Sequence, residues 1–440
     1  MSLTRDDILK ETKAKGIQFL RLQFVDVLGI PKNVEIPAKR LPQALSDGVN
    51  FDGSSIEGFV RIEESDMKLV PDLDTFTFCP WEKDDRVARI ICDVKKSDGN
   101  DFEGCSRTNL KRILNEIRAK GFEMNIGTEV EFFMFKWDDK GEPFTTDKGS
   151  YFDLLPLDHE EQLRRDMVIA LEELNFNIEA SHHEVAPGQH EIDFQYGNAL
   201  KIADNLITLK LGIKTLAIQN GYVATFMPKP VYGVPGSGMH THLSLFKDGK
   251  NAFYDPESKY CLSKEAIYFI GGIMKHAKGL TAITNPLVNS YKRLTSGYEA
   301  PVHIAWSHCN RSPLIRIPTV RNGNGARIEF RCPDPSCNPY LAFAVILTAG
   351  MDGIQKKITP PDPVNENIYA MDETKLKKYG IECLPTNLKE ALEEFKKDKV
   401  LNQGLTDHII SNYLRAKYQE WELYSLQVHP WELDQYLATY

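Results

Sequence analysis

The sequence has no pair of cysteines spaced for a disulfide or zinc framework. Its eight cysteines are scattered over 440 residues, and none belongs to a Cys-x-x-Cys motif. Scattered thiols of this kind are typical of a reducing compartment. The chain also lacks an apolar run of membrane-spanning length, and its first residues lack the apolar segment of a signal peptide. We therefore expect a cytoplasmic protein with no membrane partner.

Positive charge is in deficit, because 53 Lys and Arg residues stand against 62 Asp and Glu residues, a formal net charge of −9. This balance argues against a surface that binds nucleic acid directly. The sequence also contains neither a Walker lysine loop nor the Gly-x-Gly-x-x-Gly pattern of dinucleotide-binding folds. Any nucleotide must therefore be bound by another arrangement of residues.

The length exceeds what one hydrophobic core usually serves, so we expect two domains. A polar, glycine-containing stretch over residues 95–104 separates them, with a small strand-rich domain at 1–100 and a larger domain at 105–440. Strands followed by mixed helices and strands indicate an α+β fold. The sequence predicts later helices at 108–121, 161–174, 204–220, 263–280, 387–397 and 407–422, and strands at 123–135, 190–194, 238–246 and 326–331.

Three of these predicted strands carry charged or metal-competent residues at every second position. Alternate residues of a strand face the same side, and the residues between them here are mostly apolar. Such strands predict a charged cavity backed by a hydrophobic core. The alternating residues are Glu129 and Glu131; His240 and His242; and Arg327, Glu329 and Arg331.

Two further glutamates, Glu184 and Glu191, bracket the turn at 186–189 and can return to one site. Together the candidates supply carboxylates and one imidazole, a set that suits Mg²⁺ or Mn²⁺ better than zinc. Each motif taken alone also fits a solvated strand face, a surface loop or a structural histidine. The metal candidates are Glu129, Glu131, Glu184, Glu191, His240 and Glu329.

A set of arginines stands against these acids. Guanidinium groups bind carboxylates and phosphates through two parallel hydrogen bonds, although many arginines are simply surface residues. Metal ions and arginines in one cavity imply an anionic substrate together with a phosphate. The arginines are Arg293, Arg311, Arg316, Arg327 and Arg331.

At this point the chain resembles type I glutamine synthetases over essentially its full length. The resemblance implies an N-terminal β-grasp domain and a catalytic domain with a curved antiparallel sheet and flanking helices. It also implies ATP-dependent ligation of ammonia to the γ-carboxylate of L-glutamate through γ-glutamyl phosphate, a central step of nitrogen assimilation. The motifs that carry it lie at 51–56, 128–133, 182–193, 236–245, 289–294, 298–301, 310–312 and 327–340.

The resemblance assigns roles residue by residue. Asp52 is implied to bind and deprotonate ammonium, Glu299 to close a flap over the site, and Arg316 to assist phosphoryl transfer. Two or more Mg²⁺ or Mn²⁺ ions are implied, one held by Glu131, Glu184 and Glu191 and another by Glu129, His240 and Glu329. Glutamate contacts are implied for Gly236, Arg293, Glu299, Arg311 and Arg331, and ATP contacts for Glu179, His242, Ser244, Arg316 and Arg327.

Assembly and control are also implied by the resemblance. Asp52 would serve a neighbouring subunit in a dodecamer of two hexameric rings, with residues 431–437 either tethering the rings or forming an ordinary terminal helix. The segment 367–372 lacks the sequence that follows the modified tyrosine of adenylylated members. The chain therefore resembles the alpha subgroup, which is inhibited by glutamine and can bind transcription regulators. Arg61 matches the arginine linked to this inhibition, or else pairs with Glu63 or Glu64.

Two other functions compete with glutamine synthesis. One is a γ-glutamyl-amine or polyamine ligase of the same fold, which Asp52 and Glu299 disfavour because they suit ammonium. The other is an inactive homologue that acts as a scaffold or nitrogen sensor. Such homologues usually lose metal carboxylates, whereas every matched ligand is present here.

Overall fold

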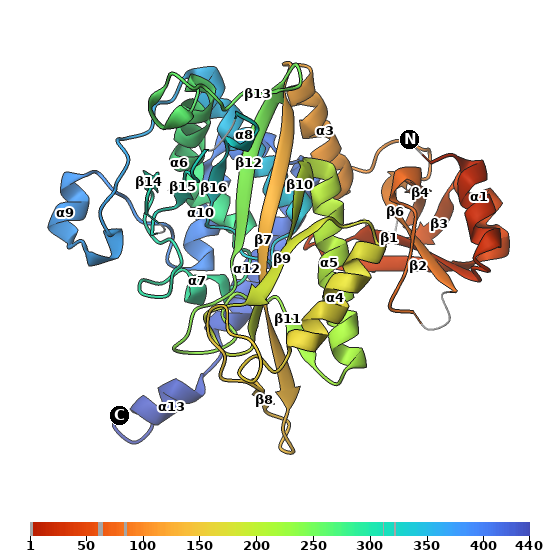
Figure 1. Ribbon diagram of the computed structural model, residues 1–440, viewed down its shortest axis with the longest axis horizontal. Coiled ribbons are helices and arrows are strands. Elements are labelled where there is room, and N and C mark those ends of the chain that lie inside the picture. The colour runs from red at the N-terminus through yellow and green to blue at the C-terminus, as the bar shows by residue number, and fades with distance from the viewer. Residues whose placement is uncertain (1–2, 60–64, 83–85, 311, 321–322) are drawn as a thin grey trace.

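The computed structural model describes residues 3–59, 65–82, 86–310, 312–320 and 323–440 (Figure 1). Its N-terminal part is a six-stranded sheet in the order β2-β1-β6-β4-β3, with β5 paired to β6. β1 and β6 run parallel, and the other pairs are antiparallel. The elements are α1 (Arg5–Ala14), β1 (Phe19–Val25), β2 (Pro31–Pro37), α2 (Leu41–Asp47), β3 (Val49–Asp52), β4 (Asp66–Pro71), β5 (Thr77–Phe78) and β6 (Val87–Lys96).

A second sheet of ten strands forms the centre of the molecule. Its main path is β14-β15-β16-β12-β7-β10-β9, with β8 and β11 on β7 and β13 on β12. β7 is the longest of these strands, with 15 residues. The strands are β7 (Glu123–Trp137), β8 (Pro143–Phe144), β9 (Ile178–His183), β10 (Gln189–Asn198), β11 (Val223–Thr225), β12 (Met239–Lys247), β13 (Lys250–Asn251), β14 (Trp306–Ser307), β15 (Ile315–Arg316) and β16 (Ile328–Phe330).

Helices pack around this sheet (Figure 1). α6 and α8 contact each other closely because Gly272 and Gly353 face backbone of the opposite helix, where a side chain would collide. Among the described residues, no helix is both long and apolar enough to cross a membrane. The helices are α3 (Ser106–Arg118), α4 (Glu161–Glu173), α5 (Ala199–Gln219), α6 (Lys264–Thr284), α7 (Ser290–Arg293), α8 (Pro339–Lys356), α9 (Glu373–Lys378), α10 (Leu388–Lys397), α11 (Lys399–Gln403), α12 (Asp407–Ser425) and α13 (Pro430–Tyr436).

Several predicted boundaries were wrong by a few residues. The helix expected to start at residue 108 starts at Ser106, and the one expected at 204 starts at Ala199, after the N-cap Asn198. The strand expected over 326–331 is confined to Ile328–Phe330. The predicted α+β class is confirmed, since a strand-rich unit precedes a mixed one.

One buried guanidinium joins the two sheets. Arg107 of α3 contacts Asp72 and Asp93 of the first unit and Asp204 of α5, each at 2.8 Å. Arg107 is only 3% exposed, so its charge depends on these carboxylates. The network fixes the N-terminal sheet against the helices that support the central sheet.

Candidate active site

The register of the central sheet brings the predicted carboxylates and imidazoles together. Glu129 of β7 lies opposite His240 of β12. On the other side of β7, Glu131 lies opposite Glu191 of β10. Because Glu129 and Glu131 share one face of β7, both pairs point into the same space. The alternation in the sequence thus becomes one charged surface across three strands.

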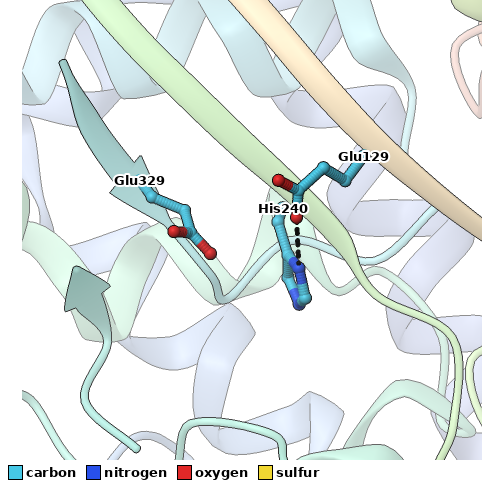
Figure 2. Close-up of side chains that lie close together, drawn as sticks. All are labelled: Glu129, His240 and Glu329. Atoms are coloured by element: carbon cyan, nitrogen blue, oxygen red, sulfur yellow. Dashed lines mark hydrogen bonds and ion pairs between the residues drawn. The ribbon is translucent and has the colours of Figure 1, made fainter. Parts of the chain in front are cut away.

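Figure 2 shows Glu129, His240 and Glu329 converging from β7, β12 and β16. Each offers a ligand atom within 4.8 Å of the others. His240 Nδ1 donates to Glu129 Oε2 at 3.1 Å, which leaves Nε2 with its lone pair. Burial, followed by the charge of Arg331, lowers the pKa of His240. A neutral imidazole with a free nitrogen is a metal ligand.

His242 completes the environment of Glu129. Arg327 Nε donates to His242 Nδ1 at 3.2 Å, so His242 Nε2 carries the proton and donates to Glu129 Oε1 at 2.8 Å. Burial raises the pKa of Glu129, but the hydrogen bonds from His240 and His242 outweigh it and hold that pKa well below its usual range. Glu129 is therefore a carboxylate at neutral pH.

Glu329 is fully buried between two guanidinium groups. Arg331 Nη1 donates to Glu329 Oε1 at 2.6 Å, and Arg316 Nε donates to the other oxygen. Burial raises the pKa of Glu329, but the Arg331 charge reverses this effect and the net shift is downward. This carboxylate stays ionised because the arginines compensate for its lost hydration.

A second group of acids surrounds Glu131. Its Oε2 accepts hydrogen bonds from the Gly238 amide at 2.8 Å and from Gln189 Nε2 at 3.0 Å. Burial, and then the charge of Glu184, raises the pKa of Glu131 to about 8. Burial and neighbouring carboxylates also raise the pKa of Glu191 well above its usual value. Carboxylates that repel one another in this way require a cation or protons between them.

The residues therefore fit two divalent ions. Glu131 and Glu191 face each other across the β7–β10 pair, and Glu184 follows β9 with His182 Nε2 3.0 Å from its Oε1. Glu129, His240 and Glu329 form the other group. Hard oxygen donors with one imidazole are the donor set that Mg²⁺ and Mn²⁺ accept.

Two cavities flank these groups. One, of about 400 Å³, is lined by Glu179, His242, Ser244 and Arg327, which are four of the five predicted ATP residues. The other, of about 30 Å³, lies on the Glu131 side. Its lining contains Gly236, Arg293, Glu299 and Arg331, four of the five predicted glutamate residues. The fifth ATP candidate, Arg316, instead pairs with Glu329 on the adjoining strands.

Other predicted residues lie away from these cavities or outside the description. Asp52 ends β3 in the N-terminal sheet, where its carboxylate accepts from the Ser54 amide at 2.8 Å, and it lines neither cavity. Arg61 and Arg311 lie outside the described residues. Glu299 is an exposed residue with a φ of 62°, a conformation that non-glycine residues rarely adopt.

Two members of the site, both on β10, were not predicted from the sequence. Gln189 is buried and bridges Glu131 to the Gly236 carbonyl, which its Nε2 reaches at 3.2 Å. Asp193 lies opposite Glu129 and lines the larger cavity. Burial, and then the charge of Glu129, raises its pKa to about 7. Both alternate with Glu191, so the same two-residue period identifies them once β10 is known to begin at Gln189.

Comparison with known proteins places this site in a family. The family model "Glutamine synthetase, catalytic domain" matches residues 103–436, and "Glutamine synthetase, beta-Grasp domain" matches residues 16–97. A glutamine synthetase of Methanosarcina mazei is 55% identical over 99% of this chain and 98% of its own length. One from Thermus thermophilus is 54% identical over the whole of both chains.

Solved structures agree with these sequence matches. A GmaS in complex with ADP superposes with a TM-score of 0.90 at 31% identity, covering all of both chains. The glutamine synthetase of Plasmodium falciparum superposes with a TM-score of 0.88 at 28% identity, covering 99% of each chain. The predicted β-grasp domain followed by a catalytic domain with a curved sheet is thereby confirmed. The central sheet gathers carboxylates, imidazoles and arginines, and the chain matches its relatives over its full length in sequence and in structure. These matches show that the chain belongs to the glutamine synthetase family.

Proposed function

We propose that this enzyme ligates ammonia to the γ-carboxylate of L-glutamate with ATP, giving L-glutamine, ADP and phosphate. The observation that carries the proposal is the pair of cavities on either side of the Glu129 and Glu131 carboxylates. One cavity has the residues for a nucleotide and the other has those for an anionic amino acid. Relatives named glutamine synthetase at 54–55% identity support the same reaction.

Divalent ions fit this function, because they neutralise the phosphates of ATP and stabilise negative charge during phosphoryl transfer. Glu129, His240 and Glu329 would hold the ion nearer the nucleotide, and Glu131, Glu184 and Glu191 the ion nearer glutamate. Arg316 and Arg331 both form ion pairs with Glu329, which is one of these proposed ligands. Their charges act on the same region where the transferred phosphoryl group gains negative charge.

The chain's own residues then orient the reactants. The guanidinium groups of Arg293, Arg311 and Arg331 bind the glutamate carboxylates, while His242, Ser244 and Arg327 bind ATP together with Glu179. A γ-carboxylate oxygen attacks the γ-phosphorus of ATP and the bond to ADP breaks, giving γ-glutamyl phosphate. Ammonia then attacks the acyl carbon and phosphate leaves.

Asp52 supplies the ammonia by attracting ammonium and accepting a proton from it. Its hydrogen bonds with Ser54 lower the pKa of Asp52, which keeps it charged for this role. Asp52 lines neither cavity of its own chain, which supports our proposal that a neighbouring copy supplies it. The flap containing Glu299 closes the site, and Tyr369 Oη donates to the adjacent Ala300 carbonyl at 2.7 Å.

This arrangement requires an oligomer, and we propose a cytoplasmic dodecamer of two hexameric rings. Support comes from α13, a helix that extends from the body of the subunit (Figure 1). Trp431 on this helix and Leu437 directly after it are 62% and 76% exposed. Packing of this helix against another ring would cover the apolar surface. Sedimentation of the whole chain and of a chain ending at residue 428 tests the assignment, because only the truncated chain should sediment as single rings.

We further propose that glutamine inhibits this enzyme. We assign the chain to the alpha subgroup, with Arg61 as the residue that couples glutamine to inhibition. As part of this assignment, we propose that the enzyme can also bind a transcription regulator. Arg61→Ala should retain synthesis and lose inhibition by glutamine. Unchanged inhibition would refute the assignment, and a direct binding titration would decide the regulator role.

The reaction itself is tested by measuring phosphate and glutamine with ATP, Mg²⁺, glutamate and ammonium. Parallel reactions with methylamine, ethylamine or putrescine identify the preferred acceptor. Ammonium should give one glutamine per phosphate, and Glu329→Gln should abolish both. Preference for an amine would make the chain a γ-glutamyl-amine ligase, and no turnover in any mixture would make it an inactive homologue.

A further inference from the structure

Lys229 lies between two segments that form walls of the smaller cavity. One is the turn at 234–238 and the other is the flap at 297–301. Lys229 itself does not line the cavity, so any effect it has on glutamate must pass through these walls. The cavity is lined from the turn by Pro235 and Gly236, and from the flap by Tyr298, Glu299 and Ala300.

The partly buried ammonium group of Lys229 contacts both walls. Its Nζ donates a hydrogen bond to the carbonyl oxygen of Val234 in the turn. The same Nζ lies 3.8 Å from the centre of the Tyr298 ring in the flap. A cation at this distance over an aromatic ring is attracted by the negative face of the ring. One side chain therefore joins the turn to the flap.

The backbone of Lys229 is fixed to the helix that carries Arg293. Its amide donates to Asn289 Oδ1 at 2.8 Å, and Asn289 Nδ2 donates to its carbonyl at 3.0 Å. An asparagine at the N-cap usually accepts a hydrogen bond from its own helix, but Asn289 at the N-cap of α7 does not. Its side chain instead holds Lys229 beside α7, which ends at Arg293.

The turn is held independently of the Lys229 side chain. The Ser237 amide donates to the carbonyl of Pro228 at 2.8 Å. A Cβ at position 236 would lie 2.1 Å from that same oxygen, so only glycine allows this close approach. Because backbone contacts already fix the turn, the ammonium group of Lys229 can act as a fixed support for the flap.

The flap is a segment that needs such support. Glu299 has a φ of 62°, a strained conformation for a residue with a side chain, and such strain persists only where surrounding contacts hold it. Both of its neighbours are held from outside the flap. Lys229 contacts Tyr298 on one side, and Tyr369 Oη donates to the Ala300 carbonyl on the other. The two contacts bracket Glu299.

We propose that Lys229 is a positioning residue that holds the flap closed over bound glutamate through its contact with Tyr298. This inference rests on the proposed function and adds a residue to it. A closed flap keeps water away from γ-glutamyl phosphate until ammonia attacks. With the flap open, a water oxygen attacks the acyl carbon and the bond to phosphate breaks, which gives glutamate and phosphate in place of glutamine.

The test compares the full-length wild type with Lys229→Met in two measurements. A cation–π contact at a partly buried site should favour the closed flap about fivefold. Lys229→Met should therefore bind L-glutamate about fivefold more weakly in calorimetry with Mg²⁺ present. At saturating glutamate without ammonium, it should hydrolyse ATP about fivefold faster than wild type. The KM for ATP should stay unchanged, because ATP occupies the other cavity.

Two further variants separate the contact from a general loss of stability. Lys229→Arg should restore wild-type values, because a guanidinium group can donate to the carbonyl and stack on the ring. The matched control is Lys136→Met. Lys136 is also partly buried, with its Nζ 4.3 Å from the centre of the Tyr222 ring, but it lines neither cavity. This control should behave like wild type.

Equal glutamate affinity and equal ATP hydrolysis in wild type and Lys229→Met would overturn the proposal. The same changes in Lys136→Met, or an equal rise in the KM for ATP, would also overturn it. If Lys229→Met does not fold, Tyr298→Leu removes the other half of the contact and should give the same two changes; wild-type behaviour would refute the role. If wild type makes no glutamine, the proposed function fails, while the glutamate affinities still decide the role of Lys229. No glutamate binding by wild type would overturn both.

Discussion

Metal binding by this enzyme should release protons, and the structure gives the size of the effect. The pKa of Glu131 in the ion-free site is raised to about 8 by burial and by Glu184. A metal-bound carboxylate must be ionised, so an ion at Glu131 displaces the proton at any pH below 8. The affinity for Mn²⁺ should therefore rise as the pH rises towards 8 and level off above that value.

The magnitude follows from the ionised fraction of Glu131. A group with that pKa is about 1% ionised at pH 6 and about 50% ionised at pH 8, which changes the affinity about 50-fold, or about 2 kcal/mol. At pH 7 about 0.9 proton leaves per ion bound through this group. The raised pKa of Glu191 adds to this release.

Calorimetric titration with Mn²⁺ in two buffers of different ionisation enthalpy counts the protons at each pH. Glu131→Gln should bind Mn²⁺ more weakly and with a smaller pH dependence. Glu123→Gln, an exposed site on the same strand, is the matched control and should resemble wild type. An affinity that is constant between pH 6 and pH 8, with no proton released at pH 7, would refute the reasoning.

Three further predictions concern single side chains. Arg331→Met leaves the buried carboxylate of Glu329 with one partner instead of two and should cost about 3 kcal/mol in urea unfolding while raising the KM for glutamate; unchanged stability would contradict the pairing. Tyr369→Phe removes the hydrogen bond to Ala300, worth about 1 kcal/mol, and should increase phosphate release per glutamine with only a small fall in Tm; a strict one-to-one ratio would show that the flap does not depend on it. Arg107→Met leaves three aspartates without their buried cation and should lower the free energy of unfolding by about 3–5 kcal/mol; a change below about 1 kcal/mol would mean that the network does not join the sheets.

The sequence predicted which charged residues share a strand face better than it predicted the helices around the sheet. Glu129 and Glu131, like His240 and His242, could be placed on one face because a strand's period of two leaves no alternative once the strand is recognised. α8 was not predicted, because its residues are apolar on all sides and give no amphipathic period. It is a buried helix that contacts α3, α5, α6 and α11.

Other parts of the site were not predicted from local sequence patterns. Gln189 was missed because the strand was expected to begin at residue 190, after the turn; Asp193 lies inside the expected strand, on the same face as Glu191, and was overlooked. Asp52 lines neither cavity of its own chain, so its proposed role depends on the proposed assembly. The pairing of Arg316 with Glu329 arises from the register of β15 on β16, two short strands that no local sequence pattern predicts.

The length and continuity of β7 have a consequence for how this enzyme can change. Glu129 and Glu131 lie two residues apart on one continuous strand, so their Cα atoms are held about 7 Å apart by the strand itself rather than by any hinge. The surrounding loops can move without altering this spacing. Deleting one residue of β7 ahead of Glu129 would turn Val130 into the cavity and both acids towards the core. The chemistry therefore tolerates insertions or deletions in this part of β7 only in multiples of two residues.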